Sequence, residues 1–186
     1  RLMRLSSPTP WLLALASLLA LFVKTHTMWG ANIYSTLAGM IANSLSFPLM
    51  LLFLASAWRD VDDGRFRLRT VLLLAGVIAS HFFTFVVACL CLAILPFLKP
   101  REWFRSVRLL AGEVGLAVLL MAWWLAPLIL KSEYSVDFGE NWDKPLFSSE
   151  TFPEYALWLA PLCLSALLFG LLRKCKPVLI FLWMGA

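Results

Sequence analysis

The segment Thr70–Leu98 reads TVLLLAGVIASHFFTFVVACLCLAILPFL, an apolar run of 29 residues with one histidine, His81, in its interior. A single helix of this length would be roughly 43 Å long, whereas the hydrocarbon core of a bilayer is ~30 Å thick. Two full crossings would need about 40 residues. Length alone therefore does not decide how often this run crosses the membrane.

The basic residues on both sides of the run favour a hairpin. Four arginines lie in residues 59–69, and four Lys and Arg residues lie in 99–108. A single crossing would place these clusters on opposite sides and violate the positive-inside rule. A turn at His81 places thirteen of the sixteen Lys and Arg residues in the cytoplasm and leaves Lys24, Lys131 and Lys144 outside. We therefore predict a short helix over 70–80, a turn at His81 and a return helix over 82–98. One long tilted helix is the alternative.

The whole chain has the composition of a polytopic helical membrane protein. It has 186 residues, of which 61% are hydrophobic, and a mean hydropathy of +0.83. The predicted fold class is all-α, a transmembrane helix bundle with a short central hairpin. We expect residues 1–186 to be part of one transmembrane domain, an internal piece of a longer chain. The predicted spans are 11–26, 37–58, 70–80 with 82–98, 107–130, 156–172 and the truncated 177–186.

The same charge argument predicts a location and excludes some functions. We expect an inner (cytoplasmic) membrane protein with loops 59–69, 99–108 and 173–176 in the cytoplasm and loop 131–155 outside it. The net charge of +5 lies in the cytoplasmic loops and is not interleaved with exposed aromatics, which argues against nucleic-acid binding. Among the acids, Asp60, Asp62 and Asp63 alternate with arginines and lack the spacing of a calcium loop, so we expect a solvated loop and no metal site.

Two groups of polar residues lie within predicted spans. Asn43, Ser44 and Ser46 precede Pro48 near the middle of the span 37–58. They are expected to face protein or a cavity, either as contacts between helices or as cavity lining. Glu113 lies one to two turns inside the cytoplasmic end of the span 107–130. Pairing with a nearby arginine and a functional role are the two readings of this acid.

The order of these features resembles the middle of GT-C-type membrane glycosyltransferases, which use polyprenyl-phosphate sugar donors. The segments that carry the resemblance are WGANIYSTLAG (29–39), NSLSF (43–47) and ASHFF (79–83), with W-x-x-P at 124–127 and F-P-E-Y at 152–155. They look more narrowly like a bacterial group described as 6-pyruvoyl-tetrahydropterin synthase-related membrane proteins.

The resemblance implies a site at the extracytoplasmic face. His81 takes the position of the polar residue that faces the donor phosphate, and the acidic loop 131–155 takes the position of a lid over the acceptor. The catalytic acid of such enzymes normally lies in the first outer loop, but 27–36 contains none, so we expect it upstream and leave the catalytic residues unassigned. The implied ligand-binding residues are His81, Asn32, Lys24, His26, Glu133, Asp137, Glu140 and Asp143.

Three functions follow from this reading. The first is a glycosyltransferase-like protein that acts on a polyprenyl-phosphate-linked sugar outside the cytoplasmic membrane. The second is a non-catalytic scaffold subunit of a membrane complex with the same fold, and the third is a transporter. The expected partners are membrane lipids, a lipid-linked sugar donor and other membrane subunits, with no nucleic acid. No cofactor is assigned, and a divalent cation beside the phosphate is left open.

Overall fold

The computed structural model describes residues 32–131 continuously, and outside this range residues 8, 11, 14, 15, 18, 21, 22, 133, 164, 165, 168 and 172. The chain forms two compact units, residues 1–123 and 124–186. Residues 32–131 are helical and contain no strand, as the all-α prediction requires. Their elements are α2 (Ile33–Leu37), α3 (Ile41–Asp63), α4 (Leu68–Ser80), α5 (Phe82–Leu92), η1 (Pro96–Leu98), η2 (Pro100–Glu102), α6 (Trp103–Leu120) and α7 (Ala122–Leu130).

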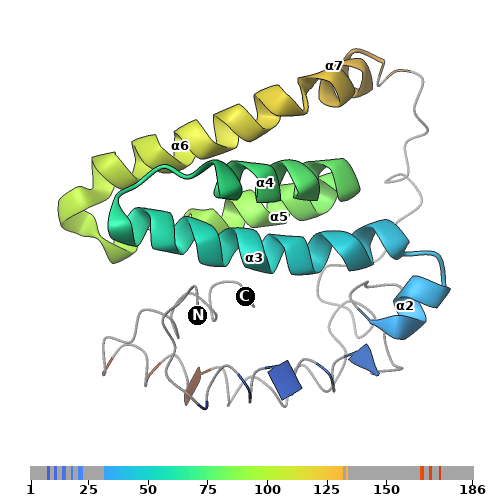
Figure 1. Cartoon of the computed structure of the whole chain (residues 1–186), viewed down its shortest axis with the longest axis horizontal. Helices are drawn as coiled ribbons and strands as arrows, with labels where there is room; N and C mark the ends of the chain where they lie inside the picture. The colour runs from blue at the N-terminus through green and yellow to red at the C-terminus, as the bar shows by residue number, and fades with distance from the viewer. Residues whose placement is uncertain are drawn as a thin grey trace. The chain divides into compact units, whose positions relative to one another are not determined.

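Helix α4 is the centre of the first unit, because α3, α5 and α6 all pack against it (Figure 1). Four of its apolar side chains, Val71, Leu74, Val77 and Ile78, are completely buried. A helix of 13 residues is about 20 Å long, too short to cross a bilayer core alone. Contacts with α3, α5 and α6 therefore bury the apolar side chains of this short helix.

The chain turns at His81, where the sequence predicts the turn. This residue has an extended backbone (φ −159°, ψ 109°), which ends α4 and begins α5. The two helices run side by side, and α5 also packs on α3 (Figure 1). Residues 70–98 are thus not one long helix.

Several predicted helix boundaries are wrong. Helix α3 continues to Asp63, so the polar residues 59–63 are helical and the connection begins at Gly64, whose left-handed backbone (φ 63°) caps the helix. Upstream, α2 replaces part of the expected turn 27–36, because Asn32 caps it. The return helix ends at Leu92, and Pro96 begins a 3₁₀ turn in place of a fourth helical turn. The span predicted over 107–130 is two helices that meet at Met121.

One helix among the described residues, α3, is long and apolar enough to cross a membrane. The segments 82–98 and 100–120 are long and apolar enough only when they are counted as one span, and the angle between them is 103°. The helix of the segment 68–80 is apolar but shorter. By length and composition, the described residues therefore contain one candidate span, or two if the bent pair forms a single span, and the predicted polytopic bundle stays a prediction.

Replacing Gly64 with alanine is expected to destabilise the protein by about 1–2 kcal/mol, because a side chain with a Cβ is strained in the left-handed region. The added Cβ would also meet the flexible guanidinium end of Arg105. Asparagine tolerates this backbone better than other residues, so Gly64→Asn is expected to lose less. Denaturant unfolding of both variants checks this, and equal losses would contradict a backbone origin.

Candidate functional site

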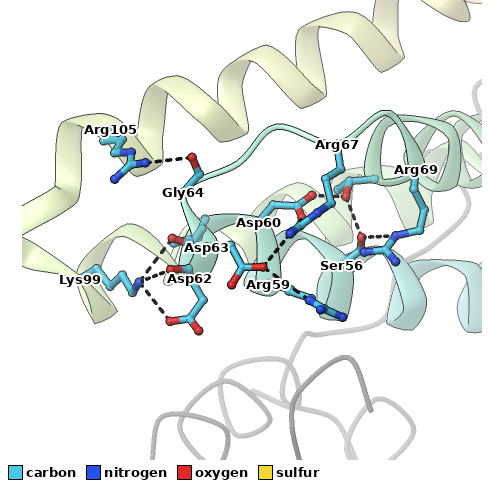
Figure 2. A network of polar contacts seen from close by, with 12 residues as sticks. Ser56, Arg59, Asp60, Asp62, Asp63, Gly64, Arg67, Arg69, Lys99 and Arg105 are labelled. Carbon is cyan, nitrogen blue, oxygen red and sulfur yellow. Dashed lines mark hydrogen bonds and ion pairs between the residues drawn. The ribbon is translucent and has the colours of Figure 1, made fainter.

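The end of α3 that leads into α4 carries a network of charged side chains (Figure 2). Asp60 is completely buried, and it accepts hydrogen bonds from the Arg67 guanidinium and the Thr70 hydroxyl. Thr70 also lies 2.7 Å from the Ser56 hydroxyl, and Arg67 donates a second bond of 2.6 Å to Asp63. The hydrogen bonds to Asp60 and then to Asp63 raise the pKa of the Arg67 guanidinium, so this side chain stays charged. The expectation of a solvated loop is therefore wrong for Asp60.

The second basic segment joins the same network. Lys99 Nζ lies 3.0 Å from the Asp62 carboxylate, and Arg105 donates a hydrogen bond of 3.0 Å to the Gly64 carbonyl oxygen (Figure 2). The chain segments 59–69 and 99–108 thus lie at the same end of the helices. Each of the three aspartates has a cationic partner, and the described residues contain no group of His, Cys, Asp or Glu suited to a metal ion.

Glu113 of α6 is completely buried beside this charged network. Neither of its carboxyl oxygens has a hydrogen-bond partner among the described residues. The Asp60 carboxyl and the Arg67 backbone amide lie close enough to influence its charge. The Arg67 side chain, however, is directed to Asp60 and Asp63, so the predicted pairing of Glu113 with a nearby arginine side chain is not formed.

The opposite end carries uncharged polar groups that centre on His81. The His81 Nδ1 atom accepts a hydrogen bond of 3.3 Å from the Thr84 backbone N–H and lies 3.0 Å from the Thr84 hydroxyl. In the tautomer in which Nδ1 accepts from the Thr84 N–H, the ring carries a proton on Nε2. No residue in the described part of the chain bonds to Nε2, and the ring is partly exposed. His81 therefore caps α5 and keeps one donor for a further partner.

A row of hydrogen bonds extends from His81 toward Asn32. The Thr84 hydroxyl donates to Asn43 at 3.1 Å, and the hydroxyl of Ser44, the next residue of α3, accepts from Thr36 at 2.8 Å. The Thr36 hydroxyl oxygen also lies 2.9 Å from the Asn32 carbonyl oxygen, while Asn32 Oδ1 accepts from the Ser35 N–H. Asn43 and Ser44 thus face α5 and α2, as predicted. A largely apolar hollow of about 220 Å³ lies beside this row, lined by Leu21, Asn32, Ile33, Thr36, Leu37 and Ser44.

The two polar groups are far apart along α3. Asn43 and Asp60 are separated by 17 residues, which corresponds to about 26 Å of helix. Ser46 lies between them and donates to the Val77 carbonyl oxygen at 3.4 Å, so it is a contact between α3 and α4. The charged network and the uncharged row therefore occupy opposite ends of the same helix.

The structure brings together two of the predicted ligand-binding residues. His81 and Asn32 both belong to the uncharged row, with Thr84, Asn43, Ser44 and Thr36 between them. Glu133 is exposed and belongs to the unit 124–186. The remaining candidates, Lys24, His26, Asp137, Glu140 and Asp143, lie outside the described residues.

Sequence reasoning missed the association of Ser56, Asp60 and Thr70. Ser56 and Asp60 are four residues apart and share one face of a helix, and Thr70 lies in the first turn of the next helix, α4. This spacing is a usable signal, but it appears only when α3 is extended beyond Trp58. Because the predicted span ends at residue 58, Asp60 falls in a predicted loop and the helical spacing from Ser56 is not recognised.

The Thr84–Asn43 hydrogen bond can be measured with a double-mutant cycle. Thr84→Val and Asn43→Leu are each expected to destabilise the protein, because either change removes a hydrogen bond from a partly buried polar partner. The coupling energy is expected to be about 0.5–1.5 kcal/mol. Strictly additive losses would show that the contact between α3 and α5 does not contribute.

Comparison of the chain with protein-family models, curated proteins and solved structures finds no match.

Proposed function

We propose that this is a membrane glycosyltransferase-like protein that binds a polyprenyl-phosphate-linked sugar at the extracytoplasmic face. The observation that carries the proposal is the separation of charged and uncharged polar groups by about 26 Å along α3. The charged end contains both basic segments, and basic segments favour the cytoplasm. The His81 end then lies outside, where a lipid-linked donor would be used.

The surface between the two ends supports membrane insertion. Large apolar side chains are exposed on the outside of α3, α4, α5 and α6, including Leu45, Leu52, Leu72, Leu90 and Leu119. Polar and charged side chains such as Asp60, Thr70 and Glu113 are buried instead. A soluble protein rarely leaves so much apolar surface in contact with water, whereas lipid solvates it.

The His81 end offers the groups that a lipid phosphate needs. The Nε2–H of His81 can donate a hydrogen bond to a phosphate oxygen. The apolar hollow beside Asn32 and Ser44 can take part of a polyprenyl chain. A phosphate donor and an apolar surface at one end of a helix bundle are the chemistry of a polyprenyl phosphate.

Glycosyl transfer at this site would follow a displacement at the anomeric carbon. A base removes the proton of the acceptor hydroxyl, the acceptor oxygen forms a bond to the anomeric carbon, and the bond to the donor phosphate oxygen breaks. The leaving phosphate carries the electron pair, which hydrogen-bond donors such as His81 would stabilise. Residues of the loop 131–155 or of segments outside residues 32–131 would supply the base.

One observation favours the non-catalytic alternative. Within residues 32–131 every acid belongs to the charged end or its neighbourhood: Asp60, Asp62, Asp63, Glu102 and Glu113. This part of the chain therefore supplies no carboxylate base to the His81 end. A subunit that binds a lipid phosphate without transferring its sugar would have this arrangement.

Binding of undecaprenyl phosphate to the full-length protein in nanodiscs tests the proposal, with undecaprenol as the matched control lipid. We expect saturable binding of the phosphate and much weaker binding of the alcohol. Equal affinities would contradict a phosphate site. Release of sugar from a polyprenyl-phosphate donor in the presence of acceptor membranes would then separate the enzyme from the non-catalytic subunit.

A further inference from the structure

The junction of α3, α4 and α6 contains two carboxyl groups, Asp60 and Glu113, that are both completely buried. The connection between α3 and α4 lies directly on α6 at this point. The Phe66 ring comes within 3.9 Å of the position that a Cβ on Gly112 would take, and Arg105 bonds to the Gly64 carbonyl oxygen. Glu113 follows Gly112 on the same helix and is close to Asp60 and to the Arg67 amide.

Asp60 is fully engaged, since one of its oxygens accepts from Arg67 and the other from Thr70. Glu113 has no hydrogen bond on either oxygen among the described residues. An ionised Glu113 would thus be a second buried negative charge without a direct partner, which is strongly unfavourable.

The cations around the junction are engaged elsewhere or exposed. On α3, Arg59 pairs with Asp63, and at the start of α4 Arg67 pairs with Asp60 and Asp63 while Arg69 bonds to Ser56. From the segment that follows α5, Lys99 pairs with Asp62. On α6, Arg105 pairs with Glu102, and Arg108 is exposed. Arg65, in the connection itself, is exposed. Among the described residues, the Arg67 guanidinium is therefore the one cation bonded to either buried carboxyl group, and it is bonded to Asp60.

We propose that Asp60 and Glu113 form a proton-binding site, in which one proton resides on Glu113 and is hydrogen-bonded to the Asp60 carboxylate. The bound proton removes the excess negative charge and gives Glu113 the partner it lacks. Its release leaves two carboxylates facing each other inside the junction, which weakens the contact between α6 and the connection 64–67. The site goes beyond the proposed lipid binding, because it lies at the other end of α3.

The sign of the pH dependence follows from proton linkage. In the proposed site the folded junction holds a proton that a glutamic acid of an unfolded chain releases near pH 4.3. Because the folded state then binds more protons, its stability falls as the pH rises. Over the pH range in which only the folded state holds the proton, the unfolding equilibrium constant is expected to rise about tenfold per pH unit.

Infrared spectroscopy of the full-length protein at neutral pH tests the site directly, since a protonated carboxyl has a C=O stretching band that a carboxylate lacks. We expect one such band to disappear in Glu113→Gln and to persist in Glu102→Gln, the control on an exposed acid of the same region. The neutral Gln side chain should also abolish the pH dependence of unfolding attributed to the pair. Glu113→Met, also neutral, serves as a second variant with the same two expectations.

Asp60→Asn separates a shared proton from simple burial. With Asp60 neutral, Glu113 is expected to ionise and replace it as the counterion of Arg67, so the band should be lost. A band that persists in Asp60→Asn would show that burial alone holds the proton, and the shared site would be wrong. The absence of any band in the unmodified protein, or its persistence in both Glu113 variants, would overturn the assignment to Glu113.

Discussion

Replacing Asp60 with alanine is expected to lower the free energy of unfolding by about 2–3 kcal/mol, because a buried carboxylate with charged and hydroxyl donors is lost. Asp60 is completely buried and is bonded to both Arg67 and Thr70. Its removal leaves the Arg67 guanidinium with its direct bond to Asp63, and with Glu113 once that acid ionises, and it takes the carboxylate acceptor from the Thr70 hydroxyl. Chemical denaturation in detergent measures the loss.

Asp62→Ala is the matched control for this experiment. Asp62 is two residues away on the same helix and also forms an ion pair, but its side chain is about one-third exposed. Exposed ion pairs contribute about 0–1 kcal/mol, so its removal is expected to cost no more than that. If Asp60→Ala and Asp62→Ala had similar small effects, the charged network would not hold the end of α3 against α4.

His81→Ala is expected to weaken the binding of undecaprenyl phosphate by about 10–100-fold, because hydrogen bonds to charged groups contribute about 1.5–3 kcal/mol. The same change also removes the cap of α5, in which Nδ1 accepts from the Thr84 N–H. The loss of a helix cap costs about 0.5–2 kcal/mol of stability. Binding in nanodiscs and thermal unfolding therefore have to be measured on the same variant.

His81→Ser separates these two roles. Serine is a good cap, so the stability of α5 is expected to be retained, but it lacks the Nε2–H that projects from the ring. We expect His81→Ser to bind undecaprenyl phosphate as weakly as His81→Ala while it unfolds close to the unmodified protein. Binding restored by serine would assign His81 a structural role alone.

The sequence was sufficient to predict the central turn and the helical class. A run too long for one span and too short for two, with basic residues on both sides, predicts a reversal near its only histidine. The structure has α4 and α5 joined at His81 and the two basic segments in contact. The apolar run and its flanking basic residues are contiguous in the sequence, so the sequence pattern alone predicts this turn.

The burial of Asp60 and Glu113 could not be predicted in the same way. Residues 59–69 look like a hydrophilic loop, because the charges alternate in sign along the chain. Extension of α3 to Asp63 instead turns Asp60 inward, onto Arg67 and Thr70 of the following segment. Tertiary packing against α6, which begins some 40 residues later, decides this burial, and no local pattern reports it.

The His81 end shows the same limit. The sequence predicts that Asn43 and Ser44 face protein or a cavity. It does not identify their partners, Thr84 and Thr36, because these belong to other helices. His81 is predicted as a ligand-binding residue, and the structure shows in addition that it caps its own helix α5. The cap depends on which ring nitrogen accepts, which only the local geometry reveals.

Cysteine-accessibility labelling in intact cells tests the central claim, that the charged end of α3 is cytoplasmic and the His81 end is outside. In a background without the four native cysteines, single cysteines replace Arg65 and Arg101 at the charged end and Ala38 at the other, three exposed positions. A membrane-impermeant maleimide is expected to label Ala38→Cys in intact cells, and to label Arg65→Cys and Arg101→Cys only after the membrane is opened. Labelling of Arg65→Cys and Arg101→Cys from opposite sides, or of all three from the same side, would contradict the account.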